Sequence, residues 1–319
     1  MTTNGSLTVS VVIPSYYRPD QLVNCLDGIF NLEKMPHEVV VVRHVDDDKT
    51  EAIVRSNPNP ITEVLTPRPG TPAARRLGVA EATGDVIAFI DDDAVPHRDW
   101  MTRLQAAFAS PLVGGVGGRD IIHRAGIPEP AKSNTVGRVS WWGRTSGNHH
   151  IGLGAARSVE FLKGCNCAYR RDAIGIATGL RGNDADDMAT GLFVHSQGLE
   201  VVYDPNILVD HYPGERPPIS KQVYLNYVYN VAYIVCSIYP SLRWRFRLYH
   251  LFIGNRASPG VVRALVGRAR HEPMMNLRTT IASQRNVWEA LREARAHPLE
   301  FWTPPGSASE TRRRALQAH

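Results

Sequence analysis

The chain has 319 residues, of which 43% are hydrophobic and 21% charged, and its formal net charge is +5 at pH 7. This apolar fraction is that of a globular protein, and the length fits one large domain or one domain with an appendage. The positive charge favours a partner that carries phosphate, such as a nucleotide or an anionic lipid.

Cysteine spacing and hydropathy narrow the class of protein further. The four cysteines match no zinc-site spacing and are too few for a disulfide scaffold, which predicts a reduced, cytoplasmic protein. The first eight residues are polar and contain no signal-peptide core. The longest nearly apolar run, 231–239, is shorter than the roughly 20 residues of a spanning helix, so we expect no membrane crossing.

The first third of the chain alternates between two patterns. Short apolar runs predict strands at 7–13, 38–42, 61–65 and 86–90. Helical spacing predicts helices at 19–30, 48–56 and 71–82, and Asp48 is expected to cap the second of these. Alternating strands and helices predict an α/β fold with a mostly parallel sheet that helices cover on both faces.

The middle and the end of the chain are less regular. Residues 123–157 are rich in Gly, Ser, Asn and Arg and predict a long loop region. Order is expected to return at 161–169, followed by a helix near 186–197 and two strands at 201–203 and 207–210. From residue 217 the pattern is helical, and the polar tail from 303 is expected to be disordered.

Three consecutive acidic residues, Asp91, Asp92 and Asp93, follow the predicted strand 86–90. In an open α/β sheet the carboxyl ends of the strands point into the ligand crevice. Adjacent carboxylates repel one another, so this triplet indicates a divalent cation with oxygen ligands. The alternative is a solvated acidic turn or a helix cap before Trp100.

Two further segments suit a nucleotide. Pro14, Tyr16 and Arg18 follow the first strand, where an aromatic ring can stack on a base and an arginine can pair with phosphate. Gly70 opens the helix that carries Arg75, and a glycine turn at a helix N-terminus followed by arginine suits an anion. Each segment alone is also typical of an ordinary turn between a strand and a helix.

Six segments, taken in order and spacing, resemble the motifs of the family 2 glycosyltransferases. They are VVIPSYYRP at 11–19, PGTPAARR at 69–76, GDVIAFIDDD at 84–93, GCNCAYRR at 164–171, DADD at 184–187 and VDH at 209–211. The resemblance covers residues 8–213. It implies the GT-A type nucleotide-diphospho-sugar transferase fold, a mostly parallel sheet flanked by helices. It also implies an inverting, hexosyltransferase-type enzyme that uses Mn²⁺ or Mg²⁺.

The resemblance also implies a division of the chain. A GT-A domain is expected at 7–215, with a nucleotide-sugar-binding half at 7–122 and an acceptor-binding half at 123–215. A C-terminal helical extension is expected at 216–302 and a disordered tail at 303–319.

Roles follow from the matched positions. Asp93 matches the metal ligand, and His211 matches a histidine that completes the metal site in several members; a strand-end histidine bonded to backbone is the alternative. The resemblance assigns donor binding to Pro14, Tyr16, Arg18, Gly70, Arg75, Asp91 and Asp92. Arg43 stands at a further donor-binding position, where it replaces the usual family residue. Those matched to the region of the acceptor or donor sugar are Gly164, Asn166 and Asp186.

The catalytic base follows from counting back from the segment 198–205, which puts the family's acidic pair on Asp186 and Asp187. Asp187 is then the expected base, and Asp184 is the alternative in a shifted register. A solvated acidic helix N-terminus remains the third interpretation.

Arg43 departs from the family pattern, which usually places there an aspartate that reads the base. An arginine cannot accept the imide hydrogen of uracil. Either Asp46 or Asp47 reaches back, or the base is not uracil. A UDP-sugar is still the first expectation for the donor.

Residues 221–253 interleave aromatic residues with arginines. This mixture suits peripheral contact with an anionic membrane at its inner face, and a helical cap or a dimer face explains it equally well. No nucleic-acid-binding motif accompanies the charge, so nucleic acid is not expected as a partner.

The predicted function is transfer of a sugar from a nucleotide sugar to the hydroxyl of a glycan, a lipid-linked acceptor or a small molecule. The reaction would be a metal-assisted single displacement in polysaccharide or glycoconjugate synthesis. One alternative is a sugar-nucleotide nucleotidyltransferase, although its glycine-rich loop is missing at 14–18. The other is a non-catalytic protein that binds the membrane surface.

Overall fold

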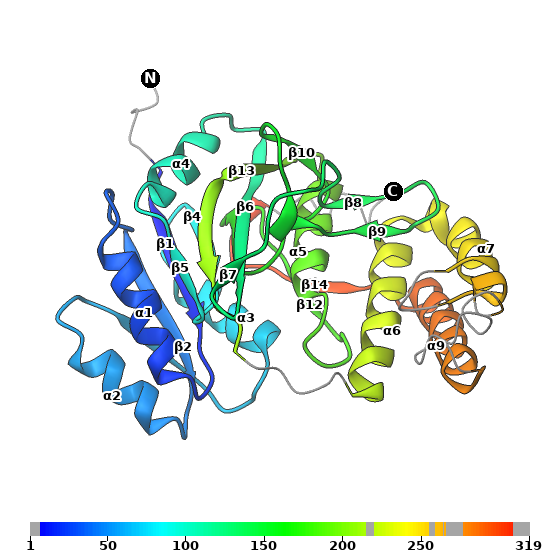
Figure 1. Ribbon diagram of the computed structural model, residues 1–319, viewed down its shortest axis with the longest axis horizontal. Helices are drawn as coiled ribbons and strands as arrows, with labels where there is room; N and C mark the ends of the chain where they lie inside the picture. Colours follow the sequence, from blue (N-terminus) through cyan, green and yellow to red (C-terminus); the bar gives the residue numbers. More distant parts are fainter. Residues whose placement is uncertain (1–6, 215–219, 255–258, 264, 266–276, 309–319) are drawn as a thin grey trace.

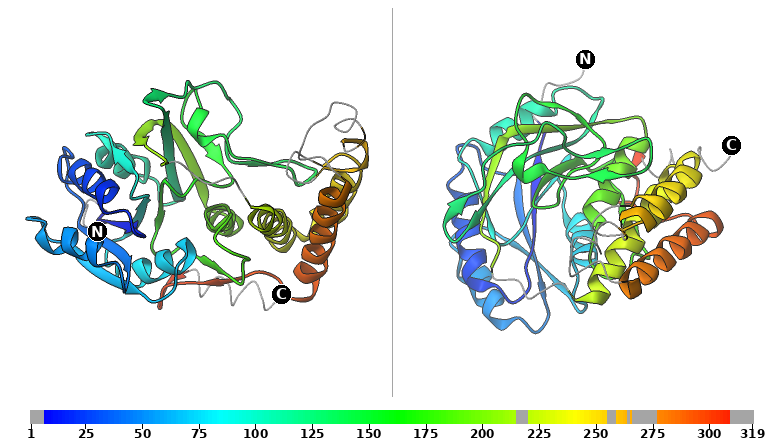
Figure 2. Two further views of the ribbon diagram at one scale, coloured as in Figure 1. Left: turned by 60° about the horizontal axis from the view of Figure 1, so that its bottom comes forward. Right: turned by 45° about the vertical axis from the view of Figure 1, so that its right-hand side comes forward.

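The computed structural model describes residues 7–214, 220–254, 259–263, 265 and 277–308. Its centre is a 10-stranded sheet with the order β10-β13-β6-β11-β4-β1-β2-β3, to which β5 and β7 attach through β13 and β6. Figure 1 shows helices α1 and α2 at one end of the molecule and α6, α7 and α9 at the other, and Figure 2 agrees.

The first third of the chain forms the parallel part of the sheet, as the sequence predicts. Its strands pair in parallel and are β1 (Val9–Pro14), β2 (Glu38–His44), β3 (Thr62–Thr66) and β4 (Val86–Ile90). The helices between them and after them are α1 (Pro19–Phe30), α2 (Asp48–Ser56), α3 (Thr71–Glu81) and α4 (Trp100–Ala107).

Side-chain alternation along these strands separates two cores. Val12 and Phe89 belong to one apolar cluster, and Val11 and Ala88 belong to the other. All four side chains are buried. The sheet is therefore apolar on both faces, which explains its nearly continuous hydrophobic strands.

The second part of the sheet is mixed. β11 (Asn166–Arg170) runs antiparallel to β4 and to β6 (Val113–Arg124), whereas β13 (Glu200–His211) runs parallel to β6. Instead of the two strands expected at 201–203 and 207–210, β13 is one strand whose register shifts between Asp204 and Leu208. Pro205 lies in this shift, where a residue without an N–H is tolerated.

The expected loop region 123–157 contains short elements rather than irregular chain alone. They are β7 (Ile127–Pro128), β8 (Arg138–Val139), β9 (Thr145–Ser146) and the 3₁₀ turn η1 (His149–Ile151). β10 (Arg157–Val159) then joins the sheet beside β13. The hydroxyl of Tyr203 donates to the carbonyl of His149, which ties η1 to the sheet.

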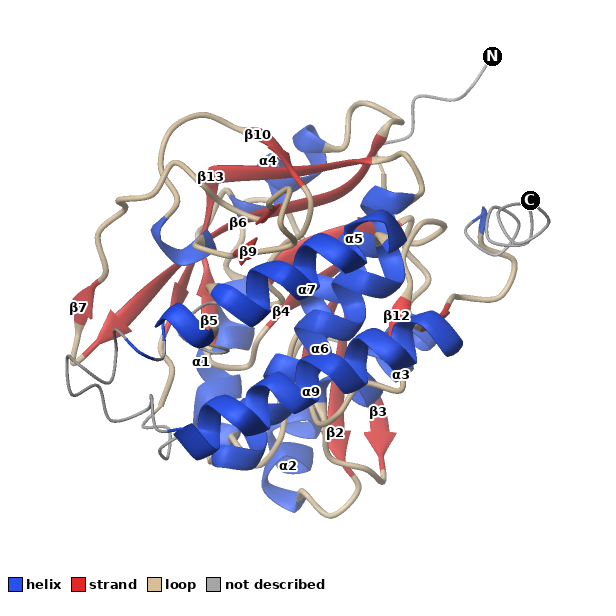
Figure 3. Ribbon diagram, turned by 90° about the vertical axis from the view of Figure 1, so that its right-hand side faces the viewer, coloured by secondary structure: helices blue, strands red, loops and turns tan. Residues whose placement is uncertain are grey.

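The C-terminal helices pack side by side on one side of the sheet, as Figure 3 shows. The remaining elements of this part are α5 (Asp186–Ser196), α6 (Lys221–Ile238), η2 (Pro240–Leu242), α7 (Arg243–Phe252) and α9 (Leu277–Ala296). β5 (Ala94–Pro96) pairs with the end of β13, and β12 (Ile176–Thr178) pairs with β14 (Glu300–Trp302). The chain thus returns from the helices to the transition between β11 and α5.

Two expectations, the absence of a membrane-spanning helix and a disordered tail, can be compared only with the described residues. None of the described helices is both long and apolar enough to cross a membrane. Most of the predicted disordered tail, 309–319, lies outside the described residues, so its disorder stays a prediction.

Candidate active site

The acidic triplet lies where β4 ends beside β1. Asp92 accepts hydrogen bonds from the hydroxyl of Ser15 at 3.0 Å and from Arg18 at 3.0 Å, and the same nitrogen of Arg18 lies 3.1 Å from Asp93. Burial raises the pKa of Asp92 to about 6, although the charge of Arg18 opposes this shift. The turn after β1 therefore supplies the cation that holds two of the three carboxylates together.

His211 reaches the triplet from the end of β13, which pairs with β5 directly after the aspartates. Its Nε2 lies 3.1 Å from Oδ1 of Asp93, and its Nδ1 lies 3.3 Å from Oδ2 of Asp120. Burial disfavours the charged ring, but the hydrogen bonds with Asp120 and Asp93 outweigh it and raise the pKa of His211 to about 12. Lys163 also pairs with Asp120.

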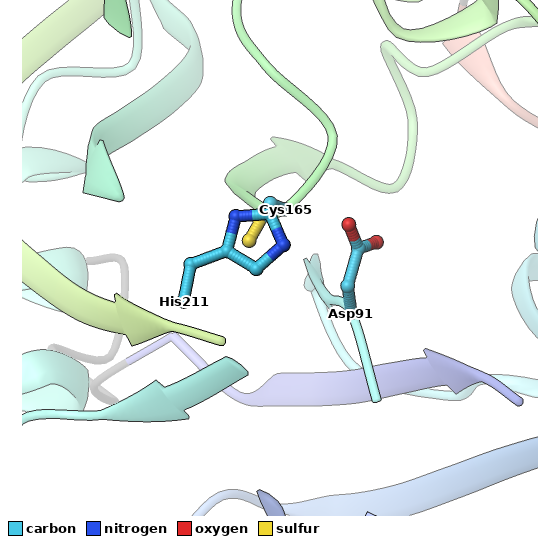
Figure 4. Close-up of side chains that lie close together, drawn as sticks. All are labelled: Asp91, Cys165 and His211. Carbon is cyan, nitrogen blue, oxygen red and sulfur yellow. The ribbon is translucent and has the colours of Figure 1, made fainter. Parts of the chain in front are cut away.

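The donor atoms fit a divalent cation. Ligand atoms of Asp91, Cys165 and His211 all lie within 4.8 Å of one another, and Figure 4 shows the Asp91 carboxylate and the His211 ring facing each other beside the Cys165 sulfur. Carboxylates with one imidazole suit Mn²⁺ or a similar ion. The carboxylates that retain a proton on His211 would equally favour a metal cation. The predicted ligands Asp93 and His211 are thus adjacent, and their role as ligands stays a prediction.

Arg75 joins this cluster to the N-terminus of α5. It donates to Asp186 at 2.8 Å and lies 3.8 Å from Asp91, with its guanidinium over the ring of Phe89. Burial opposes its charge, but Asp186 and Asp91 together raise the pKa of Arg75. A side chain at position 164 would collide with this guanidinium, which explains why Gly164 stands there.

A second position that requires glycine is the start of α3. Gly70 is the N-cap of this helix with a φ of 131°, a backbone angle that side chains rarely permit. Its carbonyl accepts from the N–H of Ala74 at 3.1 Å, so the turn that leads to Arg75 depends on it.

The acidic residues before and at the start of α5 have different surroundings. Asp186 is buried and held by Arg75, and burial raises its pKa to about 6 against the charge of that arginine. Asp187 accepts from the N–H of Gly164 at 2.9 Å and of Met188 at 2.7 Å. Burial, followed by the charge of Asp187, raises the pKa of Asp184.

Two cavities meet at these residues. One, of about 640 Å³, is lined by Arg75, Asp91, Cys165 and His211. The other, of about 330 Å³, is lined by residues that include Asn148, His149, His150 and Tyr227. Residues Lys163, Asp184, Ala185 and Asp187 line both cavities. The site can therefore hold two groups, one on each side of Asp184 and Asp187.

Arg43 does not contact this site, and the donor role predicted for it is wrong. Its buried guanidinium pairs with Glu63 and, at 2.9 Å, with Glu51, and donates to the carbonyl of His44 at 3.0 Å. The sequence could not reveal these partners, because they come from α2 and β3. Arg43 forms structural ion pairs with Glu51 and Glu63 near the β3 edge of the sheet.

The turn beside Arg43 is built from other residues. Asp47, rather than the expected Asp48, caps α2 and also accepts from the N–H of Tyr17 at 2.6 Å. Tyr16 is half exposed and packs edge-on against Tyr17 and His44, with ring centroids 4.8 and 5.8 Å away. The carboxyl ends of β1 and β2, which finish at Pro14 and His44, therefore carry a small aromatic cluster of Tyr16, Tyr17 and His44.

Asn166 is also structural rather than a sugar-facing residue. Its amide oxygen accepts from the indole N–H of Trp100 at 2.9 Å, and its amide nitrogen donates to the carbonyls of Ile207 and Arg119. It is 2% exposed, and it supports the irregular part of β13. Sequence reasoning missed Asp120, Lys163 and Cys165, although Cys165 lies within the motif 164–171.

The family model described as "Glycosyl transferase family 2" matches residues 10–175. Glycosyltransferase AglE of Haloferax volcanii is 33% identical over 116 residues, which cover 34% of this chain and only 38% of AglE. Succinoglycan biosynthesis protein ExoM of Rhizobium meliloti is 26% identical over 221 residues, which cover 65% of this chain and 67% of ExoM.

Solved structures share the fold at low identity. The mannosyltransferase PcManGT from Pyrobaculum calidifontis, in complex with GDP-Man and Mn²⁺, has a TM-score of 0.52 and 19% identity, covering 99% of this chain and 82% of that one. GalNAc-T7 with UDP, GalNAc and Mn²⁺ has a TM-score of 0.61 and 14% identity, covering 92% and 57%. Both likenesses concern the fold alone.

Proposed function

The chain belongs to glycosyl transferase family 2 and is a glycosyltransferase with the GT-A fold, and from this premise we propose that it moves a sugar from a nucleotide sugar to an acceptor hydroxyl with inversion. One observation carries the proposal: two cavities meet at Asp184 and Asp187. A direct displacement needs donor and acceptor on opposite sides of the reacting carbon, with a base beside the acceptor.

The larger cavity is the proposed donor side. Arg75, Asp91 and Lys163 line it, and a nucleotide base would stack on the cluster of Tyr16, Tyr17 and His44. Because Arg43 is engaged by Glu51 and Glu63, it projects no charge toward a base, and the acceptor for a uracil imide would come from Asp46 or Asp47. The proposed donor is therefore a UDP-sugar. The two structural neighbours contain GDP-Man and UDP, so a GDP-sugar is the donor to compare with a UDP-sugar.

Asp91, Asp93 and His211 would hold a divalent ion, Mn²⁺ or Mg²⁺. When bound, such an ion neutralises charge that develops on the leaving diphosphate. The protein's own part is to fix the ligands: Arg18 orients Asp93, and Asp120 orients His211.

Asp187 is the proposed general base. The N–H of Gly164 holds one of its oxygens at 2.9 Å, and the carboxylate borders both cavities. Asp186 is committed to Arg75 and serves to fix the start of α5 instead. Asp184 borders the same cavities and is the alternative base.

A panel of nucleotide sugars tests the proposal. The chain is incubated with each one, with Mn²⁺ and with a chelator, while thermal stability and release of nucleoside diphosphate are measured. A true donor at 100 times its dissociation constant should stabilise the fold by about 2.7 kcal/mol, and only with metal. Failure of every nucleotide sugar to stabilise the protein overturns the proposal. Release of pyrophosphate from a nucleoside triphosphate and a sugar phosphate would instead identify a nucleotidyltransferase.

A second surface supports peripheral contact with an anionic membrane at its cytoplasmic face. In the segment expected for this role, 221–252, residues 228–236 of α6 are buried, whereas α7 presents an exposed surface together with α9. Between these two helices a groove of about 1080 Å³ is lined by Trp244, Leu248, Trp288 and five arginines: Arg243, Arg247, Arg285, Arg292 and Arg295. Glu289 also lines this groove, but Arg181 pairs with it. Exposed tryptophan and leucine among arginines match the headgroup region of an anionic bilayer.

A further inference from the structure

The chain presents a sulfur atom among the oxygen and nitrogen donors of the proposed metal site. We propose that Cys165 is a third protein ligand there, so that the site binds thiophilic divalent ions such as Zn²⁺ and Co²⁺ more tightly than Mn²⁺. The Cys165 sulfur, a carboxylate oxygen of Asp91 and a ring nitrogen of His211 lie within 4.8 Å of one another (Figure 4). The inference rests on the proposed function only in placing a metal ion at this end of the sheet.

Strand register explains why the sulfur is there. β11 runs antiparallel to β4 with Asn166 opposite Ile90, so the residue before Asn166 lies beside the residue after Ile90. These two residues are Cys165 and Asp91. His211 arrives from the end of β13, so three strand ends supply one donor atom each. Donors on strand ends are held more rigidly than donors on loops, which favours binding without rearrangement.

Burial and an open side complete the site. Cys165 is 1% exposed and His211 is 3% exposed, so both donors are largely shielded from water. Asp91, Cys165 and His211 nevertheless all border the cavity of about 640 Å³. Three protein donors with one side open to a cavity are the arrangement in which zinc keeps a position for water or substrate.

The chemistry of the donors sets the order of affinity. Mn²⁺ and Mg²⁺ prefer oxygen, whereas thiolate selects zinc and similar ions. Binding would form a metal–sulfur bond and a metal–nitrogen bond, and it would release two protons to solvent, one from the Cys165 thiol and one from the His211 ring. When the ion is Mn²⁺, the oxygen ligands would be those of Asp91 and Asp93. One site would then serve two classes of ion through different donor sets.

Cys167 provides a matched control. It lies two residues further along the chain and is likewise 1% exposed, but it does not belong to the group of donor atoms. Its sulfur lies 3.8 Å from the carbonyl of Gly164 instead. Replacing either cysteine by serine changes one buried sulfur to oxygen, so the two variants differ mainly in distance from the site.

The test is titration of the purified chain with Co²⁺, which absorbs strongly in the near ultraviolet when a thiolate coordinates it. The wild-type chain and Cys167→Ser should develop this charge-transfer band, and Cys165→Ser should not. Calorimetry should show that Cys165→Ser binds Zn²⁺ at least about tenfold more weakly, since even outer partners of metal ligands contribute about 10-fold to 100-fold. Affinity for Mn²⁺ should change little, because its proposed ligands are Asp91, Asp93 and His211 rather than the sulfur.

Two outcomes overturn the inference: absence of the band in the wild-type chain, or its persistence in Cys165→Ser. Thermal unfolding without metal checks that both variants fold, and Cys165→Ala replaces the serine variant if that one does not. The result is separable from the proposed function. If the chain binds Co²⁺ through Cys165 but accepts no nucleotide sugar, the proposed function is wrong and the Cys165 ligand stands. If it accepts a nucleotide sugar but shows no Cys165-dependent band, the function stands and the Cys165 ligand is wrong.

Discussion

Two buried histidines show how the strand-end site differs from the C-terminal helices. His211 and His250 are each 3% exposed. Carboxylates of Asp93 and Asp120 raise the pKa of His211 to about 12, despite its burial. Burial alone lowers the pKa of His250 to about 4, and this ring stacks on Phe246 with centroids 4.2 Å apart. Among the described residues its Nδ1 has no hydrogen-bond partner.

Arginines differ between the same regions. In the site, Arg75 is buried and bonded to Asp186 at 2.8 Å. On the helices, Arg247 is exposed and lies over the ring of Trp288 at 3.8 Å. Charges act strongly where water is excluded and weakly where salt screens them. We therefore expect large, specific effects from substitutions in the site and small, salt-dependent effects from substitutions on the helices.

The largest effect is expected from Asp93→Ala, which should abolish metal-dependent donor binding. The fold should persist, because Arg18 keeps Asp92 and His211 keeps Asp120 as partners. Calorimetry with Mn²⁺ and a nucleoside diphosphate measures the loss, and Asp48→Ala on the exposed side of α2 is the control. If Asp93→Ala keeps the same metal-dependent affinity for the nucleoside diphosphate, Asp93 is not a metal ligand.

Asp187→Asn should retain donor binding but reduce transfer by about 10²-fold to 10⁴-fold, the usual cost of losing a general base. Asparagine can still accept from the N–H of Gly164, so the local structure should survive. Single-turnover rates with a saturating donor separate chemistry from binding. If Asp184→Asn loses transfer and Asp187→Asn does not, Asp184 is the base.

His250 should make the helical region sensitive to acid. Its pKa is lowered from 6.5 to about 4 in the folded chain, so the folded state resists protonation. This contribution to stability is fully present above pH 6.5 and is lost as the pH falls toward 4, by about 2 kcal/mol between pH 7 and pH 5. Urea unfolding should show that the free energy of unfolding of His250→Phe does not fall by this amount between pH 7 and pH 5. That of the exposed His297→Gln should fall as in the wild-type chain. Equal pH dependence in all three proteins would contradict the comparison.

The smallest effect is expected on the α7–α9 surface. Arg247→Gln and Arg292→Gln should each weaken binding to anionic vesicles by roughly 1 kcal/mol, about fivefold, and the remaining binding should fall as salt rises. Co-sedimentation measures this, with Arg55→Gln on α2 as the control. If anionic vesicles do not pellet the wild-type chain at low salt, these helices serve as a packed cap.

Short sequence patterns predicted the parallel half of the fold and the acidic triplet, because alternating apolar runs and the Asp91–Asp93 cluster are visible within short windows. The family resemblance predicted that Asp93 and His211 lie close together. Prediction from sequence failed where segments that are distant in the chain meet. Arg43 finds its partners on two other elements, and Asn166 bonds to Trp100 and Ile207, which are far away in sequence.

The same limit explains the residues that were missed. Asp120 lies in the middle of β6 and becomes part of the site only because β13 pairs beside it. The aromatic and arginine content of 221–253 was visible, but the burial of residues 228–236 of α6 depends on how that helix packs against other elements such as α9. Composition could therefore indicate a surface of this kind without locating it.

The pairing of β14 with β12 has a mechanical consequence. Phe301 of β14 stacks on Phe193 of α5 with ring centroids 4.3 Å apart, and Tyr233 of α6 donates to the carbonyl of His297. A body hinged at one end can swing freely, whereas one anchored at two separate points keeps only rotation about the line between them. The second attachment is Asn230 of α6, whose side chain accepts from the N–H of Arg181 and donates to the carbonyl of Asp184. The helices can therefore move relative to the cavity that Tyr227 borders mainly by rotation about the line between these two attachments.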